Sequence, residues 1–311
     1  MTRQFRPVME QESMQFLGLA PMDNEHFQNA RRDRSTATSL FGTKQADQHD
    51  LTSDDLRTVR DAFSDTFPLA VFNPARVWES LTPISLDADF LHGNGLFPFA
   101  DSSPVGPAFD MLRTRVSQAM AERGWRRIGI TSPTHGCGKS FVAINFAFAM
   151  ARNAGKTVTL LDFDLRRPAL HKLLGLNAPG ELREFLEGTQ PMESLFLRVG
   201  KNLALGLNGA PVADASELLQ SNDCLQALDA LDVQLNSDFV VCDMPPTLVA
   251  DDVIGLTGKL DAVLLVVDGT RTTAKDIKAC EHLFEGRLPL MGVVMNRAQD
   301  RGLGKLGYGK E

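Results

Sequence analysis

The sequence predicts an open α/β fold in which helices cover both faces of a doubly wound, mostly parallel β-sheet. Short apolar runs alternate with helical segments over about 170 residues, which is typical of parallel strands joined by helical crossovers. These runs are continuous rather than alternating, as expected for strands buried on both faces. The composition, 43% hydrophobic and 23% charged, is ordinary for a globular protein and excludes collagen-like, coiled-coil and disulfide-scaffold classes.

The first 104 residues differ from the rest and are expected to form an acidic, largely irregular arm with short helices. The first 100 hold nine basic and 14 acidic residues, and ten of the 19 phenylalanines. Within this arm, residues 52–67 place Leu56, Val59, Phe63 and Phe67 on one face of a helix, behind a Ser/Asp N-cap signal. Such a helix either packs on its own domain or docks into a groove of a partner.

From residue 105 to residue 300 the pattern is regular and indicates one folded domain. A helix is expected to begin near Pro107 and to end at Gly124. Strands are predicted at 126–132, 157–164, 203–207, 239–244, 262–268 and 290–296. Helices are predicted at 141–152, along the stripe of Leu225, Leu228 and Leu231, and at 272–286. Residues 301–311 are rich in glycine and are expected to form a flexible tail.

Charge and cysteine usage exclude several classes of function. The net charge of −7 argues against a general affinity for nucleic acid, which needs a basic surface. The four cysteines show neither a CxxC pair nor Cys/His ligand spacing, so free thiols in a reducing cytoplasm are expected. We expect neither a secretory leader nor a membrane-spanning helix, because no apolar run is long enough.

The first strand of the domain runs into the sequence SPTHGCGKS, residues 132–140, and then into a helix. A strand, a glycine loop and a helix in this order form a phosphate-binding loop. Gly136 and Gly138 let the backbone approach phosphates, Lys139 can reach the β- and γ-phosphates, and the Ser140 hydroxyl can hold Mg²⁺. Pro133 occupies the position where this pattern usually begins with glycine, so the start of the loop must differ.

Acidic and amide side chains follow later strands. Asp162 and Asp164 are suited to Mg²⁺ ligation or to orienting an attacking hydroxyl, and one of them could instead cap the next helix. Asp243 closes a hydrophobic strand, as does the acid that holds Mg²⁺ in P-loop enzymes. Asn296 could read an adenine edge or act as a surface cap. Two further acids, at 251 and 252, are expected at a solvated helix N-terminus.

Together these stretches resemble the bacterial tyrosine kinases (BY-kinases, CpsD/CapB type) of capsule and exopolysaccharide synthesis, within the MinD/ParA-like P-loop ATPases. The resemblance covers residues 105–300 and rests on ITSPTHGCGKS, LLDFDLRRPALHKLLGL, VVCDMPPTLVADDV and GVVMNR. The wider class usually carries a second lysine five residues before the loop lysine. Thr134 stands there, which favours the tyrosine kinase branch over positioning ATPases of the MinD/ParA type.

The resemblance implies the cofactors ATP and Mg²⁺ and a set of site residues. The nucleotide would contact Gly136, Cys137, Gly138, Lys139, Ser140, Phe141 and Asn296, and the metal would contact Ser140, Asp162 and Asp243. Lys139, Asp162 and Asp164 would be catalytic, one of the acids accepting the proton of a tyrosine hydroxyl.

The resemblance also implies partners. These are tyrosines of protein substrates and a membrane-anchored polysaccharide co-polymerase of the Wzz/CapA type, which would bring the chain to the inner membrane; a homo-oligomer is also allowed. Tyr308, the one tyrosine of the sequence, is the autophosphorylation candidate. Of the family's ExxRxxR oligomerisation motif, only Arg113 matches. An ATP-binding regulatory subunit with little kinase activity is therefore one alternative function, and a positioning ATPase of the MinD/ParA type is the other.

Overall fold

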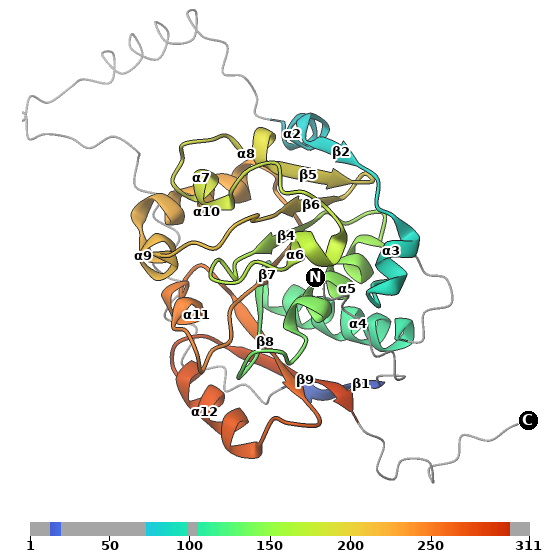
Figure 1. The fold of residues 1–311 in the computed structure, drawn as a ribbon, viewed down its shortest axis with the longest axis vertical. Coiled ribbons are helices and arrows are strands. Elements are labelled where there is room, and N and C mark those ends of the chain that lie inside the picture. The colour runs from blue at the N-terminus through green and yellow to red at the C-terminus, as the bar shows by residue number, and fades with distance from the viewer. Residues whose placement is uncertain (1–12, 20–72, 99–104, 299–311) are drawn as a thin grey trace, which may run out of the picture. The chain divides into compact units, whose positions relative to one another are not determined.

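The computed structural model describes residues 13–19, 73–98 and 105–298 (Figure 1). In these residues the strands form a nine-stranded sheet in the order β1-β9-β8-β3-β7-β4-β6-β5-β2. The strands are β1 (Ser13–Leu19), β2 (Thr82–Ile84), β3 (Arg127–Thr131), β4 (Val158–Asp162), β5 (Phe196–Val199), β6 (Leu203–Gly206), β7 (Phe239–Asp243), β8 (Ala262–Asp268) and β9 (Leu290–Ala298). All six strands predicted from the apolar runs are present, and the predicted doubly wound α/β class is confirmed.

The centre of the sheet is parallel and its margins are mixed. Neighbouring strands from β9 through β8, β3, β7 and β4 to β6 are parallel. At one margin β1 is antiparallel to β9. At the other, β5 is antiparallel to β6, and β2 adds parallel to β5. The carboxyl ends of the six parallel strands therefore lie at one edge of the sheet, where ligands bind in such folds.

Helices cover both faces of this sheet, each over its own apolar core (Figure 1). One core involves α3 (Ala88–Gly93), α4 (Gly106–Arg123), α5 (Lys139–Ala151) and α6 (Leu170–Leu174). The other involves α2 (Pro74–Ser80), α7 (Leu182–Leu186), α8 (Met192–Leu195), α9 (Ala215–Gln220), α10 (Asn222–Gln234), α11 (Asp252–Gly255) and α12 (Ala274–Phe284). Strands such as β3 and β4 are buried along their whole length, which explains their continuous apolar runs.

The sequence encodes the helix ends locally. As predicted, α4 ends at Gly124, which adopts the left-handed conformation (φ +61°) that a residue with a Cβ rarely takes. The start of α12 is a capping box: Thr273 accepts from the Asp276 N–H, and the Asp276 carboxylate accepts from the Thr273 N–H. The α5 helix carries a buried polar residue, Asn145, which donates to the Gly95 carbonyl and accepts from the Phe97 N–H.

The folded part of the chain begins before residue 105, where the sequence placed the boundary between arm and domain. Residues 73–98 form α2, β2 and α3, and their side chains Trp78, Leu81, Leu91 and Leu96 are buried in the two cores. The pairing of β2 with β5 makes this segment part of the sheet. Its apolar residues pack into the two cores together with residues from the rest of the domain. Such long-range packing is not visible in the local sequence pattern. The helix predicted at 52–67 and the tail at 301–311 lie outside the described residues.

Two further features concern sequence-based expectations. Within the described part of the chain, each helix is too short or too polar to cross a bilayer. The four cysteines are buried free thiols, as expected. Burial raises the pKa of Cys242 to about 12, so this thiol stays protonated and unreactive at neutral pH.

Candidate functional site

The loop between β3 and α5 has the backbone geometry of a phosphate cradle. Gly136 and Gly138 have φ of +78° and +93°, conformations that favour glycine. A Cβ on Gly138 would collide with the Asn296 side-chain nitrogen, so a larger residue there would have to displace Asn296. The helix starts at Lys139 with no side-chain cap on its first N–H groups. These groups have no partner within the helix and are suited to bind an anion.

The start of the loop, where Pro133 stands, is held by backbone hydrogen bonds from elsewhere in the chain. The segment that follows β7 holds it: the Thr247 N–H donates to the Ser132 carbonyl at 2.8 Å, and the Leu248 N–H donates to the Pro133 carbonyl at 3.2 Å. The Thr131 hydroxyl donates to the Pro245 carbonyl at 2.6 Å. The phosphate loop is thereby fixed to the segment that carries Asp243.

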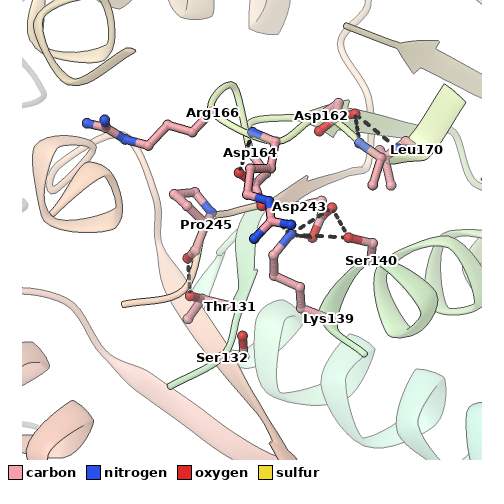
Figure 2. A network of polar contacts seen from close by, with 12 residues as sticks. Thr131, Ser132, Lys139, Ser140, Asp162, Asp164, Arg166, Leu170, Asp243 and Pro245 are labelled. Carbon is pink, nitrogen blue, oxygen red and sulfur yellow. Dashed lines mark hydrogen bonds and ion pairs between the residues drawn. The ribbon is translucent and has the colours of Figure 1, made fainter. Parts of the chain in front are cut away.

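Lys139 lies in a cluster of carboxylates at the carboxyl ends of β4 and β7 (Figure 2). Its Nζ is 2.8 Å from Asp164 Oδ2 and 3.1 Å from Asp243 Oδ1. The Ser140 hydroxyl donates to Asp243 Oδ2 at 2.5 Å, and Nζ is 3.1 Å from the Ser140 oxygen. The sheet register sets Asp162 beside Asp243 on the adjacent strand. The structure therefore brings together the five polar residues that the sequence predicted for catalysis and the metal: Lys139, Ser140, Asp162, Asp164 and Asp243.

The two acids after β4 have different surroundings. Asp162 Oδ2 accepts from the Ala169 and Leu170 N–H groups, at 3.2 and 3.1 Å, and so caps α6. The other oxygen of Asp162, Oδ1, is buried without a hydrogen-bond partner. Asp164 uses Oδ1 to accept from the Arg167 N–H and Oδ2 to hold Lys139. The capping role that the sequence left open for one acid is thus filled by Asp162, with one oxygen still available.

Three buried carboxylates lie around the single ammonium group of Lys139, and the pKa values of two of them, Asp162 and Asp243, are raised. Burial is the main cause that raises the pKa of Asp162 well above its ordinary value, and the charge of Asp243 adds to it. Burial likewise raises the pKa of Asp243, although Lys139 opposes the shift. Burial works against the charge on Lys139, but Asp243 and Asp164 more than offset it, so its pKa is raised. The cluster therefore favours additional positive charge.

These residues fit a magnesium ion that takes part of its coordination from a nucleotide. Among the residues that the structure describes, no three His, Cys, Asp or Glu side chains converge as a ready-made metal centre. Mg²⁺ commonly takes only one or two protein carboxylates and completes its shell with phosphate and water. The unpartnered Asp162 oxygen and the excess of carboxylate over ammonium are the features that such an ion would satisfy.

Two residues predicted to contact the nucleotide have other contacts as well. The Asn296 amide donates to the Cys137 carbonyl at 3.1 Å, so this side chain supports the phosphate loop from β9. The Phe141 ring is half-buried and lies at a tilt to that of Phe109, with their centroids 6.1 Å apart. Their roles toward a nucleotide remain predictions. Tyr308 lies outside the described residues.

Asp251 and Asp252 stand at the N-terminus of α11, as expected, and Asp251 is exposed there, but Asp252 is not solvated. It is fully buried, and its carboxylate accepts two hydrogen bonds from the Arg166 guanidinium at 3.0 and 3.2 Å. Local sequence gave no sign of this pair because its members are 86 positions apart. A shallow hollow of about 540 Å³ opens beside them, with Arg166, Leu248 and Ile254 in its wall.

Sequence reasoning also missed a group at the end of β8. Asp268 is fully buried and accepts from Arg271 and Arg297, and both arginines also donate to the Gly136 carbonyl of the phosphate loop. Asp268 ends one of the predicted strands at the edge where ligands bind, and this position was the available signal.

Comparison with known proteins finds similarity to a broad family of P-loop NTPases and to individual tyrosine-protein kinases. The family model described as ParA, NUBPL iron-transfer P-loop NTPase, matches residues 125–300. The putative tyrosine-protein kinase EpsB of Ralstonia nicotianae is 32% identical over 223 residues, which are 70% of this chain and 29% of EpsB. The tyrosine-protein kinase YwqD of Bacillus subtilis is 30% identical over 187 residues, 60% of this chain and 78% of YwqD. The chain thus spans less than a third of EpsB but most of YwqD.

Solved structures agree with this kinship. The kinase domain of the Escherichia coli tyrosine kinase ETK matches with a TM-score of 0.59 and 27% identity, covering 68% of this chain and 82% of that domain. The BceF tyrosine kinase domain matches with a TM-score of 0.56 and 27% identity, covering 76% of this chain and 96% of that domain.

Proposed function

We propose, on the premise that this chain belongs to the bacterial tyrosine kinase family of ParA-like P-loop NTPases, that it binds Mg·ATP at the end of β3 and transfers the γ-phosphoryl group to a tyrosine hydroxyl. The observation that carries the proposal is the buried cluster in which Lys139 lies between Asp164 and Asp243. Phosphoryl transfer needs a phosphate cradle, a cation site and a positioned proton acceptor. Residues of this chain can supply each of them within one cluster.

The phosphates would be held by the backbone N–H groups of residues 136–140. Ser140, Asp162 and Asp243 would hold Mg²⁺, which when bound neutralises charge on the transferring phosphates. Once the carboxylates have another cation, Lys139 is free to leave Asp164 and Asp243 and to reach the β- and γ-phosphates. Lys139 would therefore pair with the carboxylates in the free protein and with the phosphates when the nucleotide is bound.

Asp164 is suited to accept the proton of the attacking hydroxyl. It lies two residues beyond the end of β4, and Lys139 is its present partner. When Lys139 turns to the phosphates, Asp164 Oδ2 loses that partner and can accept a proton. A tyrosine with a pKa near 10 needs such a positioned acceptor to become a good nucleophile.

The biological setting is proposed from the relatives' names and from the resemblance. EpsB and YwqD are named tyrosine-protein kinases, which supports tyrosine as the acceptor. We propose that the chain regulates polymerisation and export of an exopolysaccharide or capsule, together with a membrane-anchored co-polymerase that supplies an activating segment. Such a partner would bring it to the cytoplasmic face of the inner membrane.

The test is incubation of the purified chain with labelled ATP and Mg²⁺, with and without the cytoplasmic segment of the co-polymerase. Label on the wild type that is lost in Tyr308→Phe supports kinase action. We expect Lys139→Ala to lose both ATP binding and label. Asp164→Asn should keep ATP binding and lose label by about 100-fold or more, the usual contribution of a positioned proton acceptor.

The same assay examines the alternative, an ATP-binding regulatory subunit with little kinase activity. Two observations favour that alternative. The sequence has one tyrosine, and Arg113, the one matching residue of the oligomerisation motif, donates to the Ala149 carbonyl of its own chain. Tight Mg·ATP binding by the wild type without any label, even with the partner segment, would establish the regulatory function. Unchanged Mg·ATP binding in Lys139→Ala would overturn both.

A further inference from the structure

Two arginines, each near the end of a different strand, donate hydrogen bonds to the same carbonyl of the phosphate loop. Arg271 follows β8 and Arg297 lies near the end of β9. Each donates to the Gly136 carbonyl oxygen at 2.9 Å. A side-chain amide from the same margin, that of Asn296, donates to the next carbonyl, of Cys137, at 3.1 Å. Two successive carbonyls of the loop are therefore held from the side of β8 and β9.

A buried carboxylate joins the two arginines. Asp268 Oδ2 accepts from Arg271 Nε and Nη2 at 3.0 and 2.8 Å, and from Arg297 Nη1 at 2.9 Å. Burial opposes the charge of Asp268, but hydrogen bonds from Thr270 and both arginines more than offset it, so its pKa lies well below its usual range. Asp268 is therefore ionised at neutral pH, and its charge-assisted bonds fix both guanidinium groups.

The backbone around this group is specialised to bring it to the loop. Arg297 has a φ of +54°, a left-handed conformation that is uncommon for a residue with a Cβ. A Cβ on Gly269 would lie 2.8 Å from the Arg297 carbonyl oxygen, so a glycine is needed for the two strand ends to approach. Strained positions of this kind persist where the surrounding structure holds them, and they cluster at functional sites.

We propose that Arg271 and Arg297, joined through Asp268, are positioning residues that orient the N–H groups of the phosphate loop before the nucleotide arrives. A trans peptide points its carbonyl and its N–H in opposite directions. Holding the carbonyls of Gly136 and Cys137 toward β8 and β9 turns the N–H groups of Cys137 and Gly138 away from the arginines. The inference rests on the proposed Mg·ATP site and assigns three further residues to it.

The experiment measures Mg·ATP affinity of the full chain by titration calorimetry, with the kcat and KM of ATP consumption. We expect Arg271→Met to raise Kd and KM about tenfold, the usual effect of losing a charged hydrogen bond, with kcat unchanged within about twofold. Arg271→Lys keeps the positive charge but lacks the planar guanidinium group, so we expect its Kd to lie between those of wild type and Arg271→Met. Asp268→Asn should raise Kd at least as much as Arg271→Met, because Asp268 fixes both arginines. The double variant should lose less than about twofold beyond Asp268→Asn, because Arg271 acts through the contact that Asp268 already holds.

The control is Arg183→Met. Arg183 lies on α7 and pairs with Asp214, away from the phosphate loop. Its Kd should equal that of the wild type. If Arg271→Met proves unstable in thermal melting, Arg271→Lys and Asp268→Asn decide the question. A Kd within twofold of wild type in Arg271→Lys and Asp268→Asn, while Lys139→Ala abolishes binding, would overturn the positioning role and leave the proposed function standing. Absence of Mg·ATP binding by the wild type would overturn both.

Discussion

The most consequential residue is Lys139, because its ammonium is the only cation within 4 Å of Asp164 and Asp243 among the described residues. Its removal leaves buried carboxylates without compensation, which costs about 3–5 kcal/mol for a buried pair. We expect Lys139→Met to melt at a lower temperature than wild type, and Mg²⁺ alone to raise its melting temperature more than that of the wild type. The measurement is thermal unfolding with and without millimolar Mg²⁺. Equal Mg²⁺ shifts in the two proteins would contradict this account.

Asp162 gives a prediction about pH. Its pKa is raised above the ordinary value of 3.8, so the folded state keeps a proton that the unfolded state releases. Stability of the wild type therefore falls as pH rises from about 4 toward the raised pKa. Asp162→Asn does not titrate and keeps an oxygen for the two N–H groups that start α6. Without metal, we expect the free energy of unfolding of Asp162→Asn to exceed that of wild type by at least about 1 kcal/mol at pH 8, and by less at pH 5.

Urea denaturation at the two pH values measures this difference. Saturating Mg²⁺ at pH 8 should narrow it, because the ion stabilises the wild type through the ionised carboxylate. A stability difference that is the same at pH 5 and pH 8 would show that Asp162 is not protonated in the metal-free fold.

At the scale of elements, α2 is the part whose role the local sequence concealed. Trp78 is buried on this helix, and its indole Nε1 donates to the Leu235 carbonyl at the end of α10, at 2.8 Å. We expect Trp78→Ala to lower the free energy of unfolding by about 3–5 kcal/mol, as for other large-to-small core changes. Urea unfolding followed by circular dichroism measures it. Val233→Ala, at a position 64% exposed on α10, should change the free energy by less than about 0.5 kcal/mol. Similar effects of the two changes would place α2 outside the folded domain.

The strands that the sequence predicted and those it missed differ in one physical respect. The six predicted strands lie in the parallel centre, where both faces are covered and apolar residues run without a break. The missed strands β1, β2 and β5 lie in the mixed margins of the sheet, and β2 has only three residues and contains Pro83. Proline weakens any strand signal, and it is tolerated here because β2 lies at the margin of the sheet. Its pairing partner is more than 100 positions away along the chain, beyond what a local pattern carries.

At the scale of the whole molecule, the same distinction separates the parts of the site. Lys139, Ser140 and Asp243 were predictable because each stands at a fixed offset from a strand end. The group of Asp268, Arg271 and Arg297 was not, because it forms only when the ends of β8 and β9 meet the phosphate loop, more than 130 positions earlier in the sequence. Topology therefore determines the support of the loop, whereas local sequence determines its chemistry.

The extent of the folded unit gives the last prediction. Residues 73–98 contribute β2 and bury Leu81, Leu91 and Leu96 completely. Burying a leucine side chain stabilises a fold by roughly 1.5–3 kcal/mol, so losing this segment removes an amount comparable with the whole stability of a domain. It also exposes the apolar faces against which these leucines pack. We expect a chain beginning at Asn73, which lacks only the marginal strand β1 of the sheet, to unfold cooperatively at a temperature no more than a few degrees below that of the full chain. A chain beginning at Val105, which keeps the phosphate loop and every predicted site residue, should melt at least about 10 °C lower or fail to unfold cooperatively. Scanning calorimetry of the two shortened chains and the full chain measures this. Equal melting of all three would restore the boundary at residue 105 and make the earlier segment dispensable to the nucleotide site.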